Sequence, residues 1–148
     1  MSTFYHDINR KVASAVEGVI NALKGSGLVG VTIFKGATFA EIVTNRIEIL
    51  TSAEVEQFGA TITGNYTVAV RVRVIGHSED ASAASHSLNV STVGDILFRD
   101  DFIAQIDALN PAVADFSADS WYPRAANDSI EGSEFVTEFT AEIHCWPS

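Results

Sequence analysis

Acidic and histidine side chains gather in the segment HSEDASAASH, between residues 77 and 86. His77, Glu79, Asp80 and His86 are residue types that bind divalent metal ions in proteins. Their spacing matches no compact metal-binding motif, and a loop rich in Asp, Glu and Ser is usually only solvated. The glycines form neither a dinucleotide fingerprint nor a phosphate-binding loop. We therefore expect neither a metal ion nor a cofactor.

Two further pairs of residues have the types that catalysis uses. Cys145 is the single cysteine and follows His144, but neighbouring residues of a strand point to opposite faces, so they do not form a nucleophile and its base. Asp100 and Asp101 are adjacent carboxylates, and neighbours on a helix diverge rather than form an acid–base couple. We expect that the protein is not an enzyme. A single thiol also excludes an internal disulfide.

Two arginines lie on the clearest predicted strand, residues 66–75. Four valines alternate with other residues along it, which is the pattern of an antiparallel strand with one buried face and one wet face. Arg71, Arg73 and Ile75 are expected on the wet face. A second strand, residues 134–146, carries three glutamates on one face, so we expect cross-strand ion pairs. The alternative is that Arg71 and Arg73 contact a neighbouring subunit.

Trp121 and Tyr122 stand in the middle of a polar segment, residues 112–133, that is rich in turn-forming residues. We interpret this segment as a long hairpin loop or as two short strands around a turn. Aromatic residues are enriched at protein interfaces, so Trp121 and Tyr122 are candidates for a protein contact. The other interpretation is that they contact a small ligand such as a carbohydrate.

Hydrophobic periodicity predicts the remaining elements. The first expected element is a helix over 7–24, capped by Asp7 and ended by the glycines at 25 and 27. A strand at 46–50 follows, then an exposed excursion over 51–65 with turns at Gly59 and Gly64, and then the strand 66–75. After a loop at 76–81 we expect a helix over 82–98, a helical segment from Asp100 that stops at Asn110 and Pro111, and the final strand 134–146. This order predicts an α+β fold. A mostly antiparallel sheet packs against the N-terminal helix and the second, central helix in a single domain, residues 1–148.

Charge is distributed unevenly along the chain, whose net charge is −10. Six acidic and seven basic residues precede residue 76, whereas thirteen acidic and only two basic residues follow Ile75. This asymmetry suggests two surfaces that face different environments, and it argues against ordinary nucleic-acid binding, which needs clustered Lys and Arg. Solubility is the simpler explanation. The polar N-terminus predicts no signal peptide, and no apolar run is long enough to cross a membrane.

The layout resembles tail terminator proteins of long-tailed bacteriophages, which are also called tail-completion proteins. The resemblance covers most of the chain: an N-terminal helix, a sheet centred on TGNYTVAVRVRVIG, a helix after a short acidic loop, and the final strand FVTEFTAEIHCW. Its most suggestive segment is residues 61–109, from TITGNYTVAVRVRV through HSLNVSTVGDILFRDDF.

The resemblance implies a structural virion protein at the head-proximal end of the tail, assembled in the host cytoplasm. It implies a homohexameric ring that caps the tail tube, stops tube polymerisation and forms the head–tail joining surface. The implied partners are further copies of the chain, the tail tube protein, and a neck or head-completion protein. DNA would pass through the ring without specific binding, and an acidic lumen would favour this, because like charges repel phosphates.

Three other classes of function are open on the sequence. A neck or head-completion adaptor would bind portal or adaptor proteins rather than the tube protein. A soluble α+β domain could bind a small ligand near Trp121 and Tyr122. An enzyme is the third class, although no nucleophile or metal constellation supports it.

Overall fold

The computed structural model describes residues 2–36, 45–58, 61–77, 83–109 and 116–147. In chain order its helices and strands are α1 (Ser2–Leu23), β1 (Thr32–Lys35), β2 (Arg46–Phe58), β3 (Thr61–His77), α2 (Ala83–Leu97), α3 (Phe102–Leu109), β4 (Phe116–Glu131) and β5 (Glu134–Pro147). The strands form one sheet in the order β1-β2-β3-β5-β4, and only the β1–β2 pair is parallel. The expected α+β fold with a mostly antiparallel sheet is confirmed.

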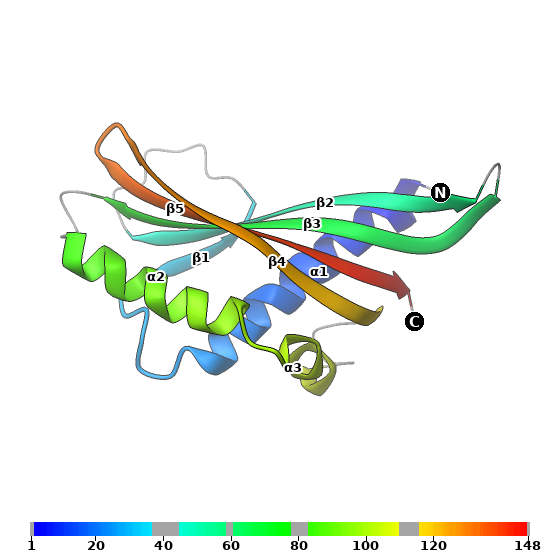
Figure 1. Cartoon of the computed structure of the whole chain (residues 1–148), viewed down its shortest axis with the longest axis horizontal. Helices are drawn as coiled ribbons and strands as arrows, with labels where there is room; N and C mark the ends of the chain where they lie inside the picture. Colours follow the sequence, from blue (N-terminus) through cyan, green and yellow to red (C-terminus); the bar gives the residue numbers. More distant parts are fainter. Residues whose placement is uncertain (1, 37–44, 59–60, 78–82, 110–115, 148) are drawn as a thin grey trace.

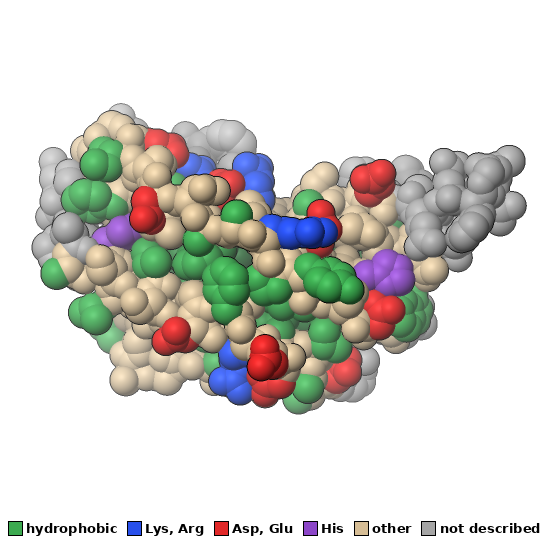
Figure 2. All heavy atoms as spheres, in the orientation of Figure 1, with side chains coloured by type: hydrophobic (Ala, Val, Ile, Leu, Met, Phe, Trp, Pro, Cys, Tyr) green, Lys and Arg blue, Asp and Glu red, His purple; other side chains and the backbone are tan. Residues whose placement is uncertain are grey.

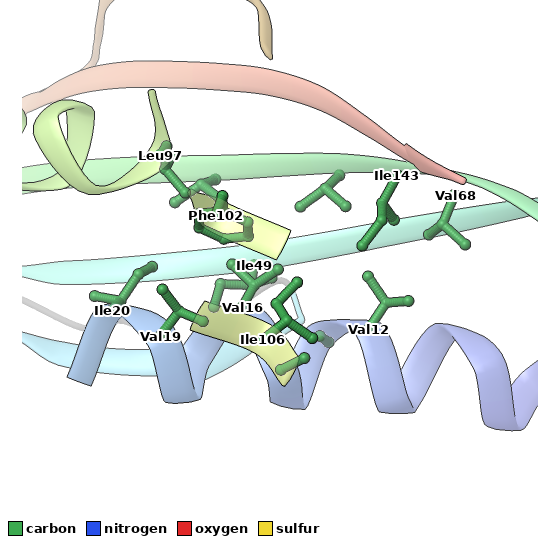
Figure 3. Close-up of a cluster of buried hydrophobic side chains, with 14 of the residues drawn as sticks. Val12, Val16, Val19, Ile20, Ile49, Val68, Leu97, Phe102, Ile106 and Ile143 are labelled. Carbon is green, nitrogen blue, oxygen red and sulfur yellow. The ribbon is translucent and has the colours of Figure 1, made fainter. Parts of the chain in front are cut away.

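The three helices lie on one face of the sheet (Figure 1). No helix of the described ranges lies on the opposite face, which we call the bare face. Helix α1 packs against β2 and against α3, while α2 packs across β3 and β5. The predicted valine row of β3 points into this helical layer and is fully buried. Figure 3 shows Val12, Val16, Val19 and Ile20 of α1 directed at the sheet, with Phe102 and Ile106 of α3 in the same cluster. The core therefore lies between the helices and one face of the sheet.

The N-terminal helix extends further than its apolar stripe predicts. It begins at Ser2, so Asp7 lies inside the helix and does not cap it. Its end agrees with the prediction, because Gly25 follows the last turn with a φ of 56°, the left-handed conformation that glycine adopts without strain.

The prediction of an exposed excursion over residues 51–65 is wrong, because the described residues of this stretch belong to strands β2 and β3. Strands β2 and β3 pair almost continuously from Arg46 opposite Ile75 to Phe58 opposite Thr61, with one register shift between Val55 and Gln57. Gly64 lies inside β3 rather than in a turn. Backbone pairing over this length outweighs the turn preference of one Gly-Asn dipeptide. The turn expected at Gly59 lies outside the described residues.

The structure of the segment 112–133 also differs from both predictions, a long hairpin loop and two short strands around a turn. From Phe116 onward it forms one long strand, β4, that pairs with β5 along its length. The strand contains two register shifts, and Pro123 borders the second of them. Proline is tolerated at an edge strand because its missing N–H faces away from the ladder. The turn between β4 and β5 uses Gly132, with a φ of 61°.

Three smaller differences concern the sheet and its flanks. Strand β1 was not predicted, since four residues carry too short a pattern. The expected loop at 76–81 starts later, because Gly76 and His77 still belong to β3. Helices α2 and α3 match the predicted segments, and the stop expected at Asn110 and Pro111 lies outside the described residues. Ile75, expected on the wet face, is 2% exposed.

Truncation of Ile49 tests the packing between α1 and the sheet. Ile49 is 1% exposed and belongs to the central cluster. We expect Ile49→Ala to lower the free energy of unfolding by about 2–5 kcal/mol, because it removes buried methyl groups and leaves a cavity. Urea unfolding followed by circular dichroism measures this change. Val29→Ala is the control: Val29 is 86% exposed, and equal losses in both variants would contradict this account of the core.

Candidate interaction surfaces

A network of ion pairs covers the centre of the bare face of the sheet. Arg73 of β3 lies opposite Glu48 of β2 and Glu138 of β5. Its Nη1 is 3.3 Å from Glu48 Oε1, its Nε is 3.5 Å from Glu138 Oε2, and its Nη2 is 3.1 Å from Glu131 Oε1. One guanidinium therefore joins carboxylates from three neighbouring strands.

Arg46 extends this network toward the end of the sheet where β5 begins. Its Nη1 and Nη2 donate to the two carboxylate oxygens of Glu134 at 2.6 and 3.2 Å, and its Nε donates to Glu48 Oε2 at 3.3 Å. Arg46 and Glu48 are 8% and 2% exposed. Burial disfavours the charged guanidinium, but the hydrogen bonds and charges of Glu134 and Glu48 outweigh this effect and raise the pKa of Arg46.

These contacts confirm the predicted cross-strand pairing of the two arginines with glutamates. Arg71 is the more exposed of the two, with its Nη1 3.7 Å from Glu138 Oε2 and about half of its side chain accessible. A subunit contact by Arg71 or Arg73 stays a prediction.

Trp121 and Tyr122 lie on opposite sides of β4. Trp121 stacks on Phe102 of α3, with ring centroids 4.1 Å apart, and its Nε1 donates to the Leu97 carbonyl at 2.7 Å. Tyr122 is 56% exposed, and the Arg124 guanidinium lies 5.9 Å from its ring centroid. The structure thus separates the pair: Trp121 anchors the α2–α3 junction to the sheet, and Tyr122 remains at the surface. An interface role for either residue stays a prediction.

A groove of about 620 Å³ lies between α2 and the ends of β4 and β5, and it was not predicted. Figure 2 shows hydrophobic side chains gathered on this face, between β4 and α2. Val90, Phe135 and Ile130 contribute apolar surface, and Ile130 is 74% exposed. On its floor Thr137 Oγ1 donates to Asp128 Oδ1 at 2.6 Å and lies 3.1 Å from His86 Nε2. Because the hydroxyl proton goes to Asp128, His86 Nε2 is the donor to Thr137.

A second groove of about 550 Å³ lies at the opposite edge of the sheet in the strand order, where β1 ends beside β2. The charged side chains that line it are Arg10 of α1, Lys35 of β1 and Arg71 of β3. Lys35 Nζ is 3.3 Å from Ser14 Oγ and 3.7 Å from Glu17 Oε1, which leaves the side chain 44% exposed. This groove is cationic, whereas the groove beside β4 has Asp128 as its charged lining residue.

Among the described residues, those considered for chemistry do not come together into a reactive site. His77 Nε2 lies 3.3 Å from Ser133 Oγ, while His86 contacts Thr137; Glu79 and Asp80 lie outside the described residues. Within the described ranges no three His, Cys, Asp or Glu residues are grouped as metal ligands would be.

Cys145 and His144 point to opposite faces of the sheet, as expected. Cys145 is fully buried under the helices, and burial together with the Asp119 charge raises the pKa of its thiol to about 12. His144 instead lies on the bare face, where its Nδ1 is 2.8 Å from Asp119 Oδ1. A thiol with this pKa stays protonated at neutral pH and is a poor nucleophile.

One sheet with helices on a single face defines the class of this chain, an α+β protein with a half-covered sheet. No known family model matches the sequence, and no curated protein matches it. Among solved structures, a chain of the structure described as "Virion of native gene transfer agent (GTA) particle" has the same fold, with a TM-score of 0.59 and 10% identity. The match covers 90% of this chain and 93% of that chain, so the two share a complete fold. No helix in the described ranges has the length and apolarity of a membrane span.

The substitution Glu48→Gln tests the ion network on the bare face. It removes a buried charge that faces two arginines, so we expect a loss of about 3 kcal/mol in the free energy of unfolding. The control is Glu142→Gln, which weakens the exposed pair with Arg124 and is expected to cost less than about 1 kcal/mol. Chemical denaturation at neutral pH compares them. Equal effects would contradict the expected penalty of removing this buried charge from beside Arg46 and Arg73.

The pH dependence of stability tests the burial of His86. Burial lowers the pKa of His86, and the nearby Asp128 charge offsets only part of this effect. The unfolded chain takes up a proton near its ordinary pKa of about 6.5, whereas folded His86 resists protonation. Folding stability should therefore fall as the pH drops below about 6.5. Urea midpoints between about pH 7 and pH 5 should fall less steeply in His86→Gln than in the wild type; parallel slopes would contradict the expectation.

Proposed function

We propose that this chain is a structural protein of a virion, and that it acts there as a tail terminator. The observation that carries the proposal is the near-complete fold match, in both directions, with a chain from a virion particle. The resemblance in layout to tail terminators supports the finer assignment. In this role copies of the chain form a ring. The ring ends tube growth and presents a surface to the head.

The bare face of the sheet suits a channel through which DNA passes. The side chains that form ion pairs on this face in the described residues are Arg46, Glu48, Arg71, Arg73, Asp119, Arg124, Glu131, Glu134, Glu138 and Glu142. Carboxylates outnumber arginines, and every arginine among them lies within 4 Å of a carboxylate. Guanidinium groups engaged in this way are poor anchors for phosphates, so DNA would slide past this face without being held.

The proposed role is non-catalytic. It requires partners rather than a reaction: further copies of the chain, the tail tube protein, and a neck or head-completion protein. No residue of the chain is assigned to an active site in this proposal, and no cofactor is required.

Electron microscopy tests the proposed function directly. Negatively stained purified protein, alone and mixed with tail tubes, should show six-fold rings or rings at one end of the tubes. Gold-labelled protein should mark the head-proximal end of tails, and tubes assembled with it should stop growing. A stable monomer that binds neither tubes nor virions would overturn the proposal. Binding to heads or necks in the absence of tubes would indicate the adaptor function instead.

A further inference from the structure

Both edges of the sheet are open in the described part of the chain. Strand β4 pairs with β5 on one side, and the sheet ends at its other side. At the opposite side, β1 pairs with β2 over residues 46–49 only, so β2 becomes the edge from Leu50 onward. These two edges belong to different strands and lie at opposite ends of the strand order.

The β4 edge has the properties of a docking strand. Residues 124–131 are all exposed, and from Ala125 to Glu131 the pairing with β5 is unbroken. A long, regular edge presents a row of backbone N–H and C=O groups to which another strand can be added. Ile130 adds exposed apolar surface beside this row, next to the groove under α2.

The grooves at the two edges carry opposite charge, while β4 itself also carries Arg124 and β2 beyond its pairing with β1 also carries Glu54. Asp128 is the charged residue of the groove beside β4, and Glu131, with about half of its side chain accessible, ends the strand. The groove at the β2 edge is lined by Arg10, Lys35 and Arg71. Two copies that meet through the same edge would therefore bring like charges together, whereas β4 of one copy matches the β2 edge of another.

Strand directions agree with such a contact. Strands β2 and β5 run in the same direction, and β4 runs opposite to both. A second copy generated by rotation about an axis along the strands keeps its strand directions, so its β2 would lie antiparallel to β4 of the first copy. We propose that the β4 edge of one copy docks antiparallel beside the β2 edge of the next copy, next to the cationic groove, which extends the sheet from copy to copy. This inference rests on the proposed ring and names the surfaces that form it, because a head-to-tail contact between different surfaces can close a ring.

Cysteine cross-linking tests the contact without requiring a stable ring. Asn127→Cys places a thiol on β4, and Ser52→Cys places one on β2; both side chains lie on the bare face. The two variants, purified separately and mixed with a short bis-maleimide, should give cross-linked dimers faster than either variant alone. Asn21→Cys on α1 is the matched control and should cross-link with neither. Buried Cys145 stays inert in all samples.

Charge reversal tests the chemistry of the same contact. Lys35→Glu should lower the cross-linking rate of the mixture roughly tenfold, because like charges then face each other across the edges. Asp128→Lys, combined with Lys35→Glu on the other copy, should restore the rate. The control Lys24→Glu makes the same charge change outside the groove and should have little effect. No change with Lys35→Glu would overturn the electrostatic part of the proposal.

The outcomes separate this inference from the proposed function. Wild-type rings with no cross-link above the Asn21→Cys control would overturn the edge contact and leave the ring standing. Cross-links without any binding to tubes or virions would support the edge contact and contradict the tail-terminator role. Absence of both cross-links and rings would overturn the two together.

Discussion

The alternation along β3 is the constraint on which the rest of the structure depends. This strand has β2 on one side and β5 on the other. Its valines therefore lie at the centre of the core, and its arginines lie at the centre of the ion network on the bare face. A slip of one residue would expose Val70 and Val72 and bury Arg71 and Arg73 under the helices. Such a register is excluded by the cost of burying unpaired guanidinium groups. The fold and the ion network are therefore two consequences of one pattern.

Much of this architecture was predictable from the sequence, because the central elements have strong periodicity. The stripe of α1 and the alternation of β3 and β5 led directly to the elements observed, and the glutamates of β5 predicted one partner of Arg73, Glu138. Its partners Glu48 and Glu131 were not predicted. Strand β4 was not predictable in the same way. Its outer half has β5 on one side only and is exposed throughout, so nothing selects for alternation there, and polar residues and Pro123 are tolerated.

The candidate surfaces were harder to predict than the strands, for a physical reason. Trp121 stacks on Phe102, which comes from a helix separated from it by a segment that carries no periodic signal of the contact. The grooves arise where α2 stops short of β4 and where β1 stops short of β2, and such offsets between elements leave no trace in local composition. Pairing between strands is encoded in sequence period, whereas the spaces between layers depend on lengths and angles that only the assembled fold defines.

The buried part of the ion network contributes more to specificity than to stability. Removing Arg46 and Glu48 from water is costly, and the attraction between them in a partly buried site returns much of that cost but little beyond it. The network favours the observed pairing register of β2, β3 and β5. Glu48, Arg73 and Glu138 lie directly opposite one another only when these three strands are aligned as observed. The charges thus reinforce on the bare face the alignment that the valines set beneath it.

The strand order also converts the charge asymmetry of the sequence into an asymmetry in space. The first half of the chain supplies α1, β1 and β2, and the acidic second half supplies β4 and β5, so the order β1-β2-β3-β5-β4 runs from a side with clustered cations to an acidic side. A sheet polarised in this way repels a copy that approaches with the same edge and attracts one that approaches with the other. At a net charge of −10 per copy, overall repulsion opposes any association, so in the proposed ring local complementarity at the edge grooves would have to select head-to-tail contacts over symmetric pairs.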